Sequence, residues 1–321
     1  MKIKLLLSAL IFLRICAGFS QDQAAGQSPP KAPRGYPNEA LLKAAYALGM
    51  LKLIDKDPPV PGNLSVFKNI VYKRADTLSL MMDIYERQDL KKAVPVLIFI
   101  HGGGWSKGKR SDYLPYLIDY AEKGYVTVTV SYRLSKVAHF PAAVEDVKCA
   151  VRWIRTHASR YHIDPEHIAL IGGSAGGHLA LMVGYTDDSL FTAGCGDTVS
   201  ASVQAVVDFY GPVDLTTEYA RHRHECTSFI GQTYDEAPAL YKAASPRFYI
   251  SGDDPPTLIF QGTIDNLVPV SQSDSLQVWL DLAGVPNEYH RLKGWPHTMD
   301  IAKKVNAYCR YYMDRFFEKY L

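Results

Sequence analysis

The sequence predicts an α/β domain in which a mostly parallel central sheet carries helices on both faces. Apolar runs such as residues 94–100 are nearly continuous, as is typical of strands buried on both faces of a sheet. These runs alternate with segments of helical periodicity, which indicates parallel strands joined by crossover helices. The 321 residues are 47% hydrophobic and 21% charged, a composition that excludes a disordered or fibrous chain.

The sheet is expected to begin with an antiparallel hairpin, because residues 66–74 and 78–86 alternate like half-buried strands around a turn. Six further strands are expected at 94–100, 125–131, 167–171, 203–209, 257–260 and 288–292. Helices are expected at 111–123, 142–160, 175–183 and 271–282, and from about Met299 onward. Residues 213–256 break the alternation, so we interpret them as a modest insertion between two strands.

Residues 1–20 have the features of a secretory signal peptide. Two lysines precede a nine-residue apolar run at 5–13, far shorter than the roughly 20 residues needed to span a bilayer. Small residues allow cleavage after Ser20. We therefore expect a secreted or periplasmic protein without stable membrane insertion, and a lipid anchor on Cys16 is the alternative.

Residues 21–62 are expected to comprise a flexible linker and a helix at 38–53, and residues 63–321 to form the main domain. The sequence leaves open the oligomeric state, and also whether residues 38–62 and 213–256 cover a functional cleft. The formal net charge is +2 and there is no long basic block, which disfavours nucleic-acid binding as the main function.

Four cysteines remain after the expected cleavage, and none of them forms a CxxC pair of the kind that binds zinc. Cys149 and Cys309 fall in helical patterns, where a cysteine is commonly a small buried hydrophobe. Cys195 and Cys226 fall in loop-like stretches. Export would permit a disulfide between these two, and two free thiols are the alternative.

The motif Gly-Gly-Ser-Ala-Gly at 172–176 follows an apolar strand directly and precedes a helix. This strand–turn–helix setting is typical of a nucleophile elbow, in which the serine lies on a tight turn. Ser174 is therefore the candidate nucleophile. The competing interpretation is a phosphate-binding loop, which would require a lysine that is missing here. His178 is expected to point down the helix, away from Ser174.

A second motif, His-Gly-Gly-Gly-Trp at 101–105, follows the buried strand 94–100. Successive glycines bring bare backbone N–H groups toward a ligand, and this motif forms the oxyanion loop of lipases and esterases. We expect Gly103 and Gly104 to donate to an oxyanion, with the N–H group of Ala175 as the third donor. His101 is interpreted as a residue that supports the loop.

A nucleophilic serine needs a histidine base and an acid that orients the base. Where the serine lies at a strand-to-helix turn, these partners follow it along the chain, each at the end of a strand, in the order acid and then histidine. Asp265 follows the penultimate predicted strand and His297 follows the last one. We therefore expect Ser174, Asp265 and His297 to act together. His290 lies inside a strand, and Asp300 is interpreted as a charge at a helix N-terminus.

With these motifs in place, the chain resembles α/β-hydrolases of the hormone-sensitive-lipase-like and bacterial feruloyl/acetyl-esterase group. The resemblance rests on His-Gly-Gly-Gly-Trp at 101–105, Tyr-Arg-Leu at 132–134, Phe-Pro-Ala-Ala-Val-Glu-Asp-Val at 140–147, Gly-Gly-Ser-Ala-Gly-Gly-His-Leu-Ala at 172–180, and residues 262–269. It extends over residues 66–320. One departure is Pro296 before His297, where the group commonly has glycine.

The resemblance implies that residues 63–321 are the catalytic domain of a serine carboxylesterase. The expected substrates are short-acyl esters, of acetyl or feruloyl type, on small molecules or carbohydrate. No metal ion and no organic cofactor are implied. The alternatives are an amide hydrolase of the same fold (an arylformamidase or exopeptidase), a general short-chain lipase or esterase, and a non-catalytic binding module.

Overall fold

One eight-stranded sheet organises the computed structural model, which describes residues 28–196 and 198–321. The strands are β1 (Leu64–Ala75), β2 (Leu78–Arg87), β3 (Val94–Ile100), β4 (Val126–Val130), β5 (Ile163–Gly173), β6 (Ala205–Phe209), β7 (Thr257–Gly262) and β8 (Asn287–Leu292). Their order across the sheet is β1-β2-β4-β3-β5-β6-β7-β8. β2 pairs antiparallel with β1 and β4, and all other pairs are parallel, so the predicted fold class is confirmed. The expected signal peptide at 1–20, with Cys16, lies outside the described residues.

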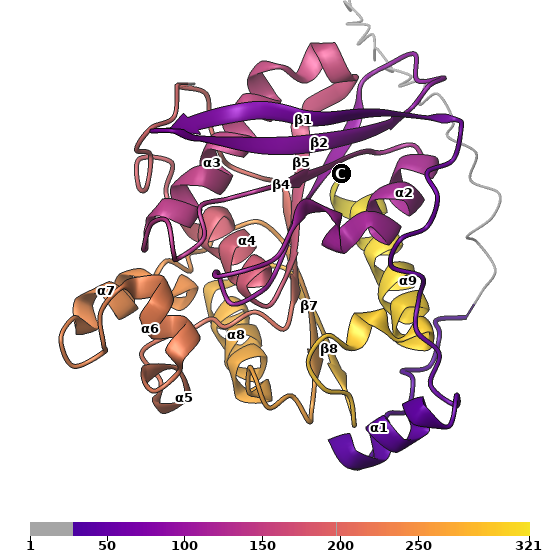
Figure 1. Cartoon of the computed structure of the whole chain (residues 1–321), viewed down its shortest axis with the longest axis vertical. Helices are drawn as coiled ribbons and strands as arrows, with labels where there is room; N and C mark the ends of the chain where they lie inside the picture. The colour runs from indigo at the N-terminus through magenta and orange to yellow at the C-terminus, as the bar shows by residue number, and fades with distance from the viewer. Residues whose placement is uncertain (1–27, 197) are drawn as a thin grey trace, which may run out of the picture. The chain divides into compact units, whose positions relative to one another are not determined.

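The helices lie on both faces of this sheet (Figure 1). They are α1 (Glu39–Ala47), α2 (Leu114–Glu122), α3 (Ala142–Thr156), α4 (Ala175–Tyr185), α5 (Glu218–Arg221), α6 (His224–Ile230), α7 (Pro238–Ala243), α8 (Val270–Ala283) and α9 (Lys303–Tyr320). α3, α4 and α8 pack on one face, where Val96 and Ile98 of β3 are fully buried. α2 and α9 pack on the other face, against Leu97 and Phe99. Successive side chains of β3 point to opposite faces of the sheet, so this strand contributes residues to the core on each face.

Three predicted segments differ in detail. The helix expected at 38–53 begins after Asn38, whose side chain caps it, and ends at Ala47 before Gly49 takes a left-handed conformation. The helix expected at 142–160 ends at Thr156 and is followed by a short 3₁₀ turn. The insertion at 213–256 folds into the short helices α5, α6 and α7.

The disulfide joins Cys149 to Cys195, so neither alternative from the sequence holds: Cys195 does not pair with Cys226, and it is not a free thiol. The two Cα atoms of the observed disulfide lie 5.2 Å apart. Cys226 is a free thiol, buried on α6. Cys149 also differs from expectation, because its place on α3 does not leave it as an isolated buried hydrophobe.

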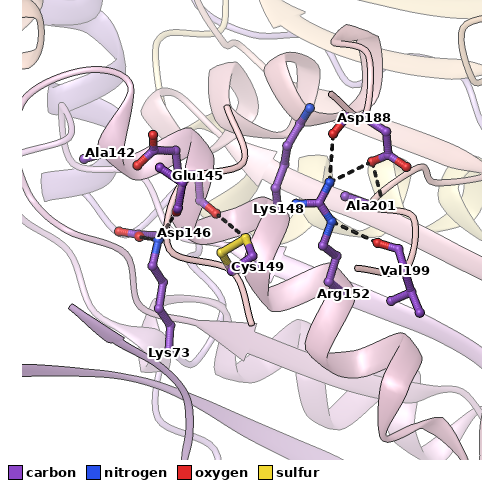
Figure 2. The surroundings of a disulfide bond; sticks show 12 residues. Lys73, Ala142, Glu145, Asp146, Lys148, Cys149, Arg152, Asp188, Val199 and Ala201 are labelled. Carbon is purple, nitrogen blue, oxygen red and sulfur yellow. Dashed lines mark hydrogen bonds and ion pairs between the residues drawn. A yellow bond between two sulfur atoms is a disulfide. The ribbon is translucent and has the colours of Figure 1, made fainter. Parts of the chain in front are cut away.

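Cationic side chains of α3 explain this pairing, because they bind the backbone of the loop that follows α4. Lys148 Nζ donates to the carbonyl oxygens of Asp187 (2.6 Å) and Leu190 (2.9 Å). Arg152 donates to the carbonyl oxygens of Asp188 (2.8 Å) and Val199 (2.9 Å) (Figure 2). These bonds hold the loop against α3 on both sides of Cys195, and they bring its sulfur to Cys149.

Candidate active site

Ser174 occupies the turn between β5 and α4 in a backbone conformation that side chains rarely adopt. Its φ is +56° and its ψ is −122°, and its N–H group donates to Phe209 O at 2.8 Å. Such strain persists only where the surroundings enforce it. Here a Cβ at position 172 would lie 2.2 Å from the Gly176 backbone, and one at position 176 would lie 2.1 Å from Ile100 O. The glycines of the motif therefore let the turn pack directly on β3.

The glycine loop 101–105 lies beside this turn, at the end of β3. Gly103 and Gly104 have φ values of +107° and +59°. Among the described residues, no backbone hydrogen bond uses the N–H groups of Gly103 or Gly104. Ala175 is the first residue of α4, so its N–H group also has no partner within the helix. Within the described residues, the N–H groups of Gly103, Gly104 and Ala175 are therefore without a backbone partner.

Trp105 anchors the glycine loop through His178. Trp105 Nε1 donates to His178 Nδ1 at 3.2 Å, and His178 Nε2 lies 2.7 Å from Ala244 O, so the ring is the neutral tautomer that donates from Nε2. The indole also stacks on Phe229 of the insertion, with ring centroids 4.5 Å apart. Burial lowers the pKa of His178 to about 4. The sequence placed His178 correctly on the helix after Ser174 but gave no sign of this contact.

His101 lies behind the loop rather than beside Ser174. Its ring is buried and stacks on Tyr132, with centroids 4.4 Å apart. The Tyr132 hydroxyl donates to His101 O at 2.9 Å. Burial lowers the pKa of the His101 imidazole. The side chain therefore supports the backbone of the loop.

Asp265 and His297, which are 32 residues apart, form a hydrogen bond of 2.7 Å between Oδ2 and Nδ1. Asp265 Oδ1 accepts from the N–H groups of Leu267 and Val268, both at 2.9 Å. Oδ2 also accepts from Gln261 Nε2 at 3.1 Å. Both carboxylate oxygens are thus satisfied, which fixes the acid and, through it, the orientation of the imidazole.

A cavity of about 780 Å³ contains Ser174, His297, Gly103 and Gly104 in its wall. The structure therefore brings together the serine, the histidine and the glycine loop that the sequence singled out, with Asp265 bonded behind the histidine. No hydrogen bond joins Ser174 to His297 within the described chain. Such bonds are often long before a substrate binds.

Two residues lie beside His297: Tyr210, which sequence reasoning did not single out, and Asp300, which it interpreted only as a charge at a helix N-terminus. Tyr210 follows β6 with φ +47°, and its ring centroid lies 4.5 Å from that of His297. Its hydroxyl donates to Asp300, which is buried in the cavity wall. Burial raises the pKa of the Asp300 carboxyl. Asp300 lies in the first turn of the short 3₁₀ helix before α9, in keeping with a charge at a helix N-terminus, but it is buried and faces this tyrosine.

A metal centre finds no support in the described ranges, because no group of three or more His, Cys, Asp or Glu side chains there could hold a metal ion. Among the helices of residues 28–196 and 198–321, none is long and apolar enough to cross a bilayer.

The chain is similar to known esterases in sequence and in fold. A relative, esterase LipQ of Mycobacterium tuberculosis, is 33% identical over 287 residues, which make up 85% of this chain and 66% of LipQ. The chain thus spans about two thirds of the length of that relative. The solved structure of a truncated carbohydrate esterase from gut microbiota is 28% identical, with a TM-score of 0.69 over 82% of this chain and 99% of the other. Esterase 2 of Thermogutta terrifontis, with propionate bound, is 29% identical, with a TM-score of 0.69 over 83% of this chain and 97% of the other.

The family model BD-FAE matches residues 82–280. This range is more than half of the chain, and it contains the glycine loop, the Ser174 turn and Asp265. It ends before His297, which the hydrogen bond to Asp265 connects to the matched part. Motifs, sheet order and family match agree, and the chain belongs to the BD-FAE family of α/β-hydrolases.

Proposed function

We propose that this protein is a serine carboxylesterase in which Ser174 is the nucleophile, His297 the general base and Asp265 the acid that orients the base. The observation that carries the proposal is the shared cavity. It holds a serine on a strained turn, a histidine bonded to a buried carboxylate, and a loop with free N–H donors. This combination is the arrangement that acyl transfer through a serine requires.

In the proposed reaction, His297 Nε2 takes the proton of Ser174 as Oγ attacks the ester carbonyl carbon. The resulting oxyanion accepts hydrogen bonds from the N–H groups of Gly103, Gly104 and Ala175, each worth about 3 kcal/mol in the transition state. His297 then gives its proton to the leaving alcohol, which departs and leaves an acyl-enzyme. Water, activated by the same histidine, releases the acid and restores the serine.

The proposed substrates are short-acyl esters, acetyl above all, carried on carbohydrate. Support comes from the neighbours, since one is described as a carbohydrate esterase and another has propionate bound. The insertion supports it as well, because Tyr219, Arg223 and Glu225 line the cavity. An aromatic face and charged hydrogen-bonding groups suit the hydroxyl groups of a sugar better than a long alkyl chain.

We also propose that the protein is exported, with residues 1–20 as the signal peptide. The Cys149–Cys195 disulfide supports this, because disulfides persist mainly in oxidising compartments. Cell fractionation and N-terminal sequencing test it: we expect a mature chain that begins at Gln21 outside the cytoplasm. A full-length chain in the cytoplasm would contradict export.

A hydrolysis panel with variants tests the catalytic proposal. Ser174→Ala should reduce kcat on p-nitrophenyl acetate at least about 10³-fold, whereas Ser65→Ala on β1, as a control, should not change it. An organophosphonate should label Ser174 alone. Full activity in Ser174→Ala, or labelling of another serine, would overturn the assignment.

The substrate class is tested on the wild-type protein. Acetylated xylan, methyl ferulate, N-formylkynurenine and p-nitrophenyl esters of increasing chain length form the panel. We expect acetate release from xylan, and a steep fall in kcat/KM beyond about six acyl carbons, because the charged side chains of Arg223 and Glu225 lie in the wall of the cavity. A preference for p-nitrophenyl decanoate without acetate release would indicate a lipid ester instead, and a preference for N-formylkynurenine would indicate an amide hydrolase.

A further inference from the structure

Residues 33–57, which we call the strap, precede β1 and contact the loop that carries His297. At its first end, Gly35 N donates to Lys293 O at 3.1 Å and Tyr36 N donates to Gly294 O at 2.8 Å. Trp295 Nε1 donates back to Pro33 O at 2.8 Å. Part of the segment expected to be a flexible linker is thus hydrogen-bonded two residues before the histidine.

The other end of the strap pairs with the same loop beyond the histidine. Leu53 forms an antiparallel bridge with Ala302. Ile54 N donates to Ile301 O at 2.9 Å, and Lys303 N donates to Lys52 O at 2.8 Å. The loop between β8 and α9 is therefore fastened by backbone hydrogen bonds on both sides of His297.

Between these ends, the strap contacts the loop that carries the acid. Glu39 of α1 accepts a hydrogen bond of 2.9 Å from Asn266, the residue next to Asp265. Figure 1 shows α1 beside the ends of β7 and β8 from which these two loops start. Farther along, Ile54, Lys56 and Asp57 line the cavity that contains Ser174. The strap thus touches both loops of the His–Asp pair and the cavity itself.

We propose that the strap is a positioning element of the active site, which holds His297 at the place where it can reach Ser174. This inference rests on the proposed role of His297 as the base. Pro296 and His297 lie in a loop without helix or strand, so the backbone bonds to the strap limit how far the imidazole can move. Misplacement of a catalytic group by about 1 Å can cost about 10²-fold in rate. The BD-FAE match begins at residue 82 and does not include the strap.

Gly35→Ala tests the proposal from outside the catalytic residues. A Cβ at position 35 would lie 2.2 Å from Gly294 O, so the methyl group forces the strap away from the histidine loop. Gly62→Ala is the matched control, because a Cβ there meets nothing within 4 Å. We expect Gly35→Ala to lower kcat on p-nitrophenyl acetate about 10- to 100-fold with a smaller change in KM. Gly62→Ala should behave as wild type.

Hydrogen exchange separates positioning from a general loss of stability. In Gly35→Ala, amides of residues 293–303 should exchange faster while those of β3 and β5 keep their protection. If Gly35→Ala fails to fold, the double variant Glu39→Ala/Lys304→Met tests the positioning role of the strap instead. It removes the bond to Asn266 and the bond from Lys304 to Arg34 O (2.8 Å), both at exposed sites, and should lower kcat several-fold.

Two results would overturn the inference. One is a folded Gly35→Ala protein with wild-type kcat. The other, should that variant not fold, is wild-type kcat in the double variant. Neither outcome touches the proposed function, which depends on the loss of activity in Ser174→Ala. Conversely, an active Ser174→Ala would refute the proposed function whatever the strap variants do.

Discussion

His178 and Asp208 are buried next to the Ser174 turn, and they should give stability opposite dependences on pH. Burial lowers the pKa of His178 from 6.5 to about 4 and raises that of Asp208 from 3.8 to about 7. Asp208 Oδ1 accepts from Gly211 N at 2.9 Å, and its Oδ2 has no hydrogen-bond partner among residues 28–196 and 198–321. Each group is thus kept neutral in the folded chain where the unfolded chain would ionise it.

The sign follows from which state binds more protons. Between pH 6.5 and about 4, His178 is protonated in the unfolded chain but not in the folded chain, so the free energy of unfolding decreases as the pH falls. Between pH 3.8 and about 7, folded Asp208 keeps a proton that the unfolded form releases, so stability is lost as the pH rises. Each slope is about 1.4 kcal/mol per pH unit, which makes about 3 kcal/mol for His178 and about 4 kcal/mol for Asp208. In the wild type the two slopes cancel between about pH 4 and 6.5.

The variants His178→Gln and Asp208→Asn should reveal these slopes. Glutamine can still accept from Trp105 and donate to Ala244, so it removes the titration and keeps the hydrogen-bonding pattern. Urea unfolding at pH 4.5, 5.5 and 6.5 gives the free energy of each variant relative to wild type. That difference should move by about 1.4 kcal/mol per pH unit, in opposite directions for the two variants. The double variant should show no such trend. Differences that stay constant with pH would refute the burial argument.

Two further predictions concern the face of the sheet that carries α3. Reduction of the Cys149–Cys195 disulfide, which closes a separation of 46 residues, should destabilise the protein by about 2–4 kcal/mol in urea unfolding, and reductant should have no effect on the Cys149→Ser/Cys195→Ser variant. Asp146→Asn should cost about 3–5 kcal/mol, because it leaves the buried Lys73 ammonium, now 2.8 Å from Asp146, without its ion pair, whereas Asp89→Asn, which breaks an exposed pair, should change stability little.

The sheet and the main site residues could be predicted because their signals are local in the sequence. A strand buried on both faces reads as an apolar run, and 94–100 was predicted to the residue. The carboxyl ends of parallel strands meet at one edge of the sheet, so residues that directly follow such strands lie near one another. This rule brought Ser174, Asp265 and the glycine loop together, and the final strand added His297.

The contacts that the sequence did not reveal are those between one loop and another. Cys195 lies next to Cys149 because lysine and arginine side chains of α3 donate hydrogen bonds to backbone carbonyl groups of the loop after α4. A sequence pattern does not show which carbonyl groups accept such bonds. The strap is a similar case. Most of its bonds to residues 293–303 join backbone atoms, which every residue has, so composition indicated only a linker and a helix.

The glycine at position 35 is nevertheless a sequence feature that this contact requires, because any larger residue there would collide with Gly294 O. A glycine in a linker and a glycine in a close backbone contact look alike in one sequence. The two cases are distinguished by the residue that the glycine contacts. Here that residue is Gly294, which has a φ of +78° and follows the last strand. Gly35 lies before the first strand and Gly294 after the last, and a side chain at either position would collide with the backbone of the other segment. At this contact the N-terminal segment becomes part of the active site.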